Sequence, residues 1–485
     1  MSDDLAMLDA TAQAALIRLG ELSPVEAVDA AIERIERLNP ELNAVIHERF
    51  TQARIEAAGP LPDGPFRGVP MVLKDLDGVS AGDPFHAGMQ HLKDAGYLAD
   101  HDSWLTTRFR QMGAVFVGRT NTPEFGLLPS TEPAAYGPTH NPWDPTRSPA
   151  GSSGGSAAAV ASGMVALGHA GDGGGSIRLP ASVCGLVGLK PTRGRCSIGP
   201  EAGEAWAGLV SRLVVTRSVR DTAGVLDAVW GSAPGDPYTA PPPLRPYLDE
   251  LTASPRALRI GWTNGSPDPT APTHDDVAAV VRTAAEALAG LGHRVDEAAP
   301  ASWADPDAGV AFTTHFLNAM GVWVAAEADH VGVLTGTAVT EAGVEPHTWA
   351  MAEFGRSVSG TTYFAAIEAI HAYGRTMAGF WADDDYDLLV TPTIPEAPWT
   401  LGQFGPEEGN PLAGMFRAAA IVPFTAPFNA TGQPAISLPL GETPSGLPVG
   451  VQLVAAAGRE DLLLAVAAQL EEALPWADRR PGIHA

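Results

Sequence analysis

Short β-like runs alternate with helical runs along most of this chain, and the alternation limits the folds open to it. Strand-like runs stand at 69–73, 114–118, 258–262, 293–296, 388–391 and 449–454, and helix-like runs stand at 103–112, 221–230, 275–291 and 461–474. Such a βαβ rhythm is typical of α/β proteins, in which helices cover a parallel sheet. We therefore predict a single large α/β/α fold around a mixed, mostly parallel central sheet.

The N-terminal 60 residues are predicted to be helical. A helix over 6–19 should stop at Gly20, and the run 23–26 (SPVE) supplies an N-cap, a first-turn proline and a capping-box glutamate for a second helix. The pair Asn39-Pro40 should end that helix. We predict one domain over 1–485, with N-terminal helices at 1–60.

The charge and cysteine content exclude several classes of partner. The formal net charge is −26, which repels phosphate backbones and anionic lipids, so we expect neither a nucleic acid nor a membrane partner. The two cysteines, Cys184 and Cys196, have neither disulfide nor metal-ligand spacing. No export signal or transmembrane run is recognisable, and the prediction is a cytoplasmic protein. The histidines form no paired ligand motif, so we expect no metal and no other cofactor.

Three segments contain residues that can do chemistry: 71–75 (MVLKD), 149–156 (PAGSSGGS) and 171–178 (GDGGGSIR). The glycine-rich loops lack the Lys-Ser/Thr pair of a phosphate-binding loop, which disfavours nucleotide binding. The run 151–155 matches G-x-S-x-G, a nucleophile elbow with Ser153 as nucleophile. That motif needs a strand just before the serine, whereas 141–150 carries three prolines. The segment 157–167 is alanine-rich, and we predict a buried helix there.

The order and spacing of these segments, together with 118–125, 188–195 and 427–435, resemble the amidase signature family. Members of that family are serine hydrolases with a Ser, cis-Ser, Lys triad. The resemblance covers nearly the whole chain and is greatest to the branch of 6-aminohexanoate cyclic dimer hydrolases and related lactam or linear amide hydrolases. It implies that Ser176 is the nucleophile, Ser152 the bridging cis-serine and Lys74 the general base.

The resemblance also implies an oxyanion hole formed by the backbone N–H groups of Gly173, Gly174, Gly175 and Ser176. The implied reaction is hydrolysis of a small-molecule carboxylic amide, other than a peptide, through a serine acyl-enzyme. Lysine can act as a base only when neutral, and an ordinary lysine is neutral in roughly one molecule in 2,500 at pH 7. Burial at the end of an apolar strand could lower its pKa.

The resemblance also implies a signature core at about 61–230 and a variable substrate-pocket region at about 300–420. In or next to that region, Phe316, Asn318, Trp323 and Phe424 are candidate pocket walls and equally candidate core residues. The resemblance places a cysteine near Asn318 in related lactam hydrolases, and Thr or Ile in many members where Gly173 stands. Two alternatives stay open: a glutaminase-type subunit of a tRNA-dependent amidotransferase, and a catalytically silent binding protein. A homodimer is an assembly that the sequence leaves open.

Overall fold

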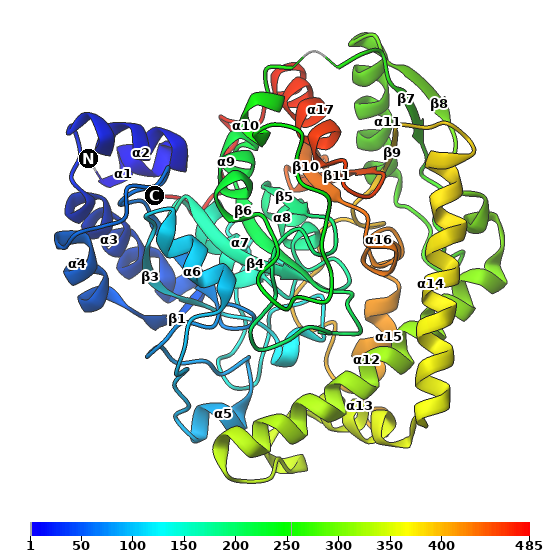
Figure 1. Ribbon diagram of the computed structural model, residues 1–485, viewed down its shortest axis with the longest axis horizontal. Coiled ribbons are helices and arrows are strands. Elements are labelled where there is room, and N and C mark those ends of the chain that lie inside the picture. Colours follow the sequence, from blue (N-terminus) through cyan, green and yellow to red (C-terminus); the bar gives the residue numbers. More distant parts are fainter. Residues whose placement is uncertain (1, 254) are drawn as a thin grey trace.

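One mixed sheet forms the centre of the molecule (Figure 1). The computed structural model describes residues 2–253 and 255–485. Across the sheet the strands run in the order β1 (Val45–Glu48), β3 (Val115–Thr120), β2 (Pro70–Lys74), β4 (Leu167–Asp172), β6 (Ser211–Thr216), β5 (Val187–Lys190), β10 (Ala435–Glu442), β11 (Pro448–Ala455), β9 (Leu388–Pro392), β7 (Arg259–Trp262) and β8 (Arg294–Glu297). The predicted single large α/β fold with a mixed sheet is confirmed.

The prediction of a mostly parallel sheet is wrong. Parallel pairs occur in two groups, β3-β2-β4 and β9-β7-β8, whereas the other neighbours from β4 to β9, and β1 with β3, pair antiparallel. The βαβ signals come from the two parallel groups. The central strands include β4, whose sequence LGHAGD is fully buried yet has neither alternation nor β-branched residues. Strands of this composition cannot be predicted from the periodicity of hydrophobic residues.

The helices at the N-terminus follow the prediction with two differences. The predicted helix over 6–19 is divided into α1 (Ser2–Met7) and α2 (Ala10–Leu19), because Asp9 caps the second helix by accepting the N–H of Ala12. The capping box at the start of α3 (Pro24–Leu42) is confirmed. That helix continues past Pro40, because a proline in the last turn removes only one hydrogen bond.

The remaining helices cover the sheet and extend away from it. They are α4 (Phe50–Ala58), α5 (Gln90–Asp94), α6 (Trp104–Gln111), α7 (Gly154–Ala161), α8 (Arg178–Cys184), α9 (Val219–Val229), α10 (Tyr247–Glu250), α11 (Asp275–Gly290), α12 (Pro306–Thr335), α13 (Pro346–Ser357), α14 (Gly360–Ala382), α15 (Ala413–Ala419), α16 (Ala426–Thr431) and α17 (Glu460–Ala473). The buried helix predicted over 157–167 is α7, which is entirely buried but ends at Ala161 before β4 begins. In Figure 1, α12, α13 and α14 lie together along one side of the sheet.

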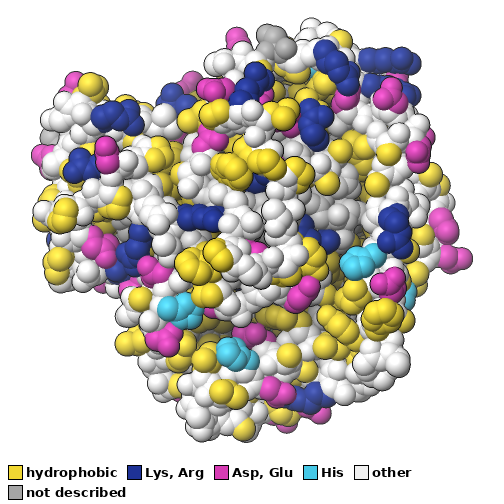
Figure 2. All heavy atoms as spheres, viewed as in Figure 1, with side chains coloured by type: hydrophobic (Ala, Val, Ile, Leu, Met, Phe, Trp, Pro, Cys, Tyr) yellow, Lys and Arg dark blue, Asp and Glu magenta, His cyan; other side chains and the backbone are white. Residues whose placement is uncertain are grey.

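Two surface features bear on the predicted partners. Acidic and basic side chains are interspersed over the face of the molecule shown in Figure 2. None of the helices in the described residues combines the length and the hydropathy that a membrane span requires.

Candidate active site

Lys74 lies at the carboxyl end of β2, a strand in which every residue is buried. Its side chain is 1% exposed, and its Nζ donates a hydrogen bond of 2.7 Å to Ser152 Oγ. Arg119 on the neighbouring strand β3 holds this strand end, because one Nη donates to the Lys74 carbonyl and Nε contacts the carboxylate of Asp75 at 3.2 Å. The lysine is therefore fixed inside the protein and aimed at Ser152.

Ser152 lies in the loop that enters α7. The Gly151–Ser152 peptide bond is cis, and Ser152 is 2% exposed. Thr131 Oγ1 donates to the carbonyl of Ala150 and so ties the loop to a neighbouring segment. Ser153 is fully buried and donates to the carbonyl of Gly171, away from the cavity that Ser152 lines. The nucleophile-elbow alternative for Ser153 is wrong, since its side chain is used inside the fold and no strand precedes it.

Ser176 follows β4 in a short loop that leads into α8. It is half-buried and lines the same cavity as Lys74 and Ser152. No hydrogen bond joins Ser176 to Ser152 among the contacts of the described residues. The backbone N–H groups of Gly173, Gly174, Gly175 and Ser176 likewise have no acceptor within the described part of the chain. These donors are free to bind an oxyanion, as the oxyanion-hole prediction requires.

A buried ion pair between Arg178 and Asp172 holds the loop that carries Ser176. The guanidinium of Arg178 contacts the Asp172 carboxylate at 2.8 Å, and both side chains are 0% exposed. Asn429 on α16 donates to both the carbonyl and the carboxylate of Asp172. Burial alone would raise the pKa of Asp172, but Arg178 and the hydrogen bonds outweigh it and lower that pKa to about 2. A charged network thus connects the loop to the C-terminal part of the chain.

Glycine is required at Gly175 by the backbone and by close packing. Its φ is +144°, and a Cβ there would lie 2.6 Å from Thr425 Oγ1. Thr425 Oγ1 itself donates to the carbonyl of Gly174 at 2.6 Å. At Gly173, a Cβ would lie 3.0 Å from the ring of Trp206. The indole therefore fills the space that the larger side chains expected at this position would need.

The environment of Lys74 favours its neutral form. Burial lowers the pKa of Lys74 to about 8, against the opposing field of Asp77 and Asp172. Asp77 is itself paired with Arg212 at 3.0 Å, which limits its attraction for a charged lysine. A substantial fraction of the lysine is consequently neutral near pH 8, whereas an ordinary lysine is almost entirely charged there.

Two cavities meet at Ser176 and share one long helix as a wall. The first has a volume of about 390 Å³ and is mainly apolar, with Phe312, Phe316 and Met320 of α12 in its wall. The second has a volume of about 400 Å³, contains Lys74 and Ser152, and is bounded by Trp323 and Glu327 of the same helix. Trp206 lines both, and its ring contacts those of Phe316 and Trp323 at centroid distances of 6.1 and 5.8 Å.

The predicted pocket residues divide into two pairs. Phe316 and Trp323 line the cavities, which agrees with the prediction. Asn318 and Phe424 are not among the residues that line either cavity in the described structure. Asn318 is two residues from Phe316 on α12, and side chains so spaced point to different sides of a helix. Phe424 is fully buried against the ring of Trp303.

Several residues of the site were not predicted. Asn429 stands in a segment that carried the family resemblance, but nothing in its neighbours indicates a contact with Asp172, 257 residues away. No sequence motif marks Trp206, Thr425 or Glu327. Only the folded chain brings these side chains to the loop that bears Ser176.

The chain belongs to the Amidase family, which it matches over residues 26–464. It is 44% identical over 480 residues to the 6-aminohexanoate-cyclic-dimer hydrolase of Pseudomonas sp. (strain NK87), covering 98% of this chain and 96% of that protein. It is 34% identical over 497 residues to an acylamidase of Rhodococcus erythropolis, covering 99% and 98%.

A solved structure gives the same result in three dimensions. The structure of a 6-aminohexanoate cyclic dimer hydrolase complexed with substrate superimposes with a TM-score of 0.94 at 43% identity, covering 99% of this chain and 100% of that one. The chain is accordingly an amidase, a hydrolase of carbon–nitrogen bonds.

Proposed function

We propose that this amidase hydrolyses a small non-peptide amide through an acyl-enzyme on Ser176, with Ser152 as proton relay and Lys74 as general base. The observation that carries the proposal is the buried 2.7 Å contact between Lys74 Nζ and Ser152 Oγ in a cavity that Ser176 lines. A serine hydroxyl needs a base to remove its proton during attack. Among the residues that line this cavity, a buried lysine next to a second serine meets that need.

In the acylation step, neutral Lys74 accepts the proton of Ser152 while Ser152 accepts the proton of Ser176. The Oγ of Ser176 bonds to the carbonyl carbon, and the oxyanion is bound by the N–H groups of 174–176. The carbon–nitrogen bond then breaks, and the proton returns through Ser152 to the leaving amine. Water then attacks the resulting ester while its proton passes through Ser152 to Lys74. The carbon–oxygen bond to Ser176 breaks, the proton returns through Ser152 to the Ser176 oxygen, and the carboxylic acid leaves. Each well-placed oxyanion donor is worth about 3 kcal/mol in the transition state.

We propose a lactam or linear aliphatic amide as the substrate class. The apolar cavity beside Ser176 suits a chain of methylene groups, and relatives at 44% identity are 6-aminohexanoate-cyclic-dimer hydrolases. A cytoplasmic location and a homodimer stay predictions from the sequence.

The two alternatives differ in what they require. A glutaminase-type subunit should co-purify with a second subunit and release ammonia from glutamine, so this alternative stays a prediction that both measurements test. A silent binding protein needs a damaged site, whereas the contact between Lys74 and Ser152 is intact and the chain belongs to a family of hydrolases.

Serine labelling and substrate turnover test the proposal together. The chain should hydrolyse 6-aminohexanoate cyclic dimer or hexanamide, and phenylmethylsulfonyl fluoride should label Ser176, as located by peptide mass spectrometry. Ser176→Ala should abolish turnover and labelling, and Lys74→Ala should slow labelling. Ser153→Ala is the matched control, because it removes a neighbouring serine hydroxyl that does not line the cavity. Turnover that survives both Ser176→Ala and Lys74→Ala would overturn the assignment.

A further inference from the structure

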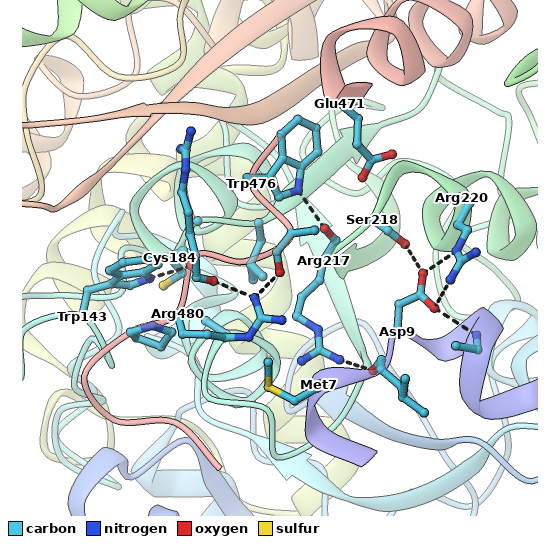
Figure 3. Close-up of a pocket in the computed structure, with 18 residues that line it drawn as sticks. Met7, Asp9, Trp143, Cys184, Arg217, Ser218, Arg220, Glu471, Trp476 and Arg480 are labelled. Atoms are coloured by element: carbon cyan, nitrogen blue, oxygen red, sulfur yellow. Dashed lines mark hydrogen bonds and ion pairs between the residues drawn. The ribbon is translucent and has the colours of Figure 1, made fainter. Parts of the chain in front are cut away.

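A third pocket, of about 210 Å³, lies where the N-terminal helices, the end of α8, the start of α9 and the C-terminal tail meet (Figure 3). It has no lining residue in common with either cavity at Ser176. Apolar side chains make up much of its wall: Met7, Leu8, Trp143, Leu186, Trp476 and Pro481. The proposed reaction uses nothing in this pocket.

Two arginines of this pocket have no acidic partner. Arg217 donates to the carbonyls of Ala6 and Leu8, and Arg480 donates to the carbonyls of Ala477 and Arg479. Within the described residues, neither guanidinium forms an ion pair, and Nε of Arg480 is buried without a partner. Both arginines line the pocket, and Figure 3 shows the Arg217 guanidinium beside Met7 and the Arg480 guanidinium bonded to carbonyls of the tail.

A third arginine of the pocket, Arg220, does have an acidic partner. Arg220 also lines the pocket, and its guanidinium contacts the Asp9 carboxylate at 2.6 Å. Asp9 is held there by Ser218 as well. Its carboxylate therefore pairs with Arg220 and acts on Arg217 only at longer range, as Asp221 does. Glu471 also lines the pocket, but its carboxylate accepts the N–H of Val219. Among the described residues, Arg217 and Arg480 donate hydrogen bonds to carbonyl oxygens only.

The positive charge extends beyond the pocket wall. Arg34 is 1% exposed and donates to the carbonyls of Met164 and Ser2, without an acidic partner among the described residues. Burial and the nearby charge of Arg217 lower the pKa of Arg34 to about 10, and burial and the charge of Arg480 lower the pKa of Arg217 to about 10. Buried charges in proteins are normally paired. In a chain of net charge −26, this concentration of unpaired cations is unusual.

We propose that this pocket binds a small carboxylate with a short apolar tail. Two guanidinium groups present N–H donors that suit a carboxylate, and charge-assisted bonds of this kind are the strong ones. The indole and aliphatic walls suit the tail, and the volume admits only a small ligand. Hydrolysis of an amide releases a carboxylate, but the inference stands on the pocket alone.

A bound carboxylate would join two ends of the chain. Arg217 is bonded to the carbonyls of the turn between α1 and α2, and Arg480 belongs to the C-terminal tail. An anion held by both would link these segments through one ion. Binding should therefore raise the melting temperature of the protein.

Calorimetric titration of the Ser176→Ala protein with hexanoate tests the proposal, with hexanamide as the uncharged ligand of the same shape, which this variant should not hydrolyse to hexanoate. Hexanoate should bind, and Arg480→Gln should raise the Kd of hexanoate at this pocket about tenfold or more. A hydrogen bond to a charged group is worth about 1.5–3 kcal/mol, which corresponds to a change of that size. Arg217→Gln should do the same. Arg479→Gln is the matched control: Arg479 also lines the pocket, but its guanidinium is engaged by the Pro439 carbonyl and Glu442. Hexanoate should also raise the Tm of the unaltered chain but not that of Arg480→Gln.

Each outcome decides the matter. Binding of hexanoate in the reactive cavity would be indifferent to Arg480→Gln, so an unchanged affinity in that variant overturns the proposal. Equal affinity for hexanamide overturns it too. Inorganic phosphate that binds through Arg480 more tightly than hexanoate would make this an inorganic oxyanion site and would overturn the carboxylate class. If Arg217→Gln does not fold, Arg480→Gln still decides, because Arg480 contacts only carbonyls of the tail.

Discussion

Replacing Gly175 with alanine tests whether the oxyanion donors depend on the exact backbone shape of the loop. The added Cβ would lie 2.6 Å from Thr425 Oγ1 and 2.8 Å from Leu179 Cγ, at a φ of +144° that side chains rarely adopt. The loop must therefore move, and it carries the N–H groups of 174–176 with it. The loss of one oxyanion donor costs about 10²- to 10³-fold in kcat, so we expect a fall of that size in Gly175→Ala.

Gly174→Ala is the matched comparison. A Cβ at Gly174 meets only the edge of the Phe316 ring, at 3.8 Å, which is an ordinary contact. This variant should keep kcat within about tenfold of the original, well short of a lost donor. Turnover of a saturating amide gives kcat, and circular dichroism with the Tm shows whether the variants fold. An unchanged kcat in a folded Gly175→Ala protein, or equal damage in both variants, would refute the steric reasoning.

Three further predictions concern charge. Only neutral Lys74 can act as the base, and its pKa is about 8. In a pH–rate profile, kcat should therefore rise about tenfold per pH unit below pH 8 and level off above it. A profile that is flat from pH 6 to 9 would contradict this role. Asp172→Asn leaves Arg178 without its buried partner and should cost about 3–5 kcal/mol of unfolding free energy, measured by denaturant titration; an unaltered midpoint would show that the pair is not needed. Glu327 is half-buried in the wall of the second cavity. Its ionised carboxylate would attract an ammonium group there, so Glu327→Gln should raise KM for an amide bearing an ammonium group by roughly tenfold but not KM for hexanamide. Equal KM changes for both substrates would exclude a charge effect.

Local signals in the sequence predicted local structure well. The capping box of Ser23 and Glu26 begins α3, and Ser103 caps α6 close to where the helical run was expected. Each of these features depends on residues only a few positions apart, so the interactions that decide them are visible in the sequence.

Features that depend on distant parts of the chain could not be predicted in the same way. The antiparallel centre of the sheet contains β4, whose glycine, alanine and histidine become a strand only when neighbouring strands bury them. Of the pocket residues, Phe316 and Asn318 could be told apart only by the rotation of α12, which tertiary packing sets. The contact of Asn429 with Asp172 joins residues 257 positions apart.

In the proposed mechanism, the long helix α12 separates the residues that contact the substrate from those that carry out the reaction. The reacting side chains belong to β2 and to loops held in the sheet, whereas one helix outside it presents Phe316 to one cavity and Trp323 and Glu327 to the other. Substitutions along a single element can therefore reshape both ends of the substrate space while the acyl-transfer machinery stays intact. Divergence of new substrate ranges within such a scaffold needs no change in the residues that make and break the bond.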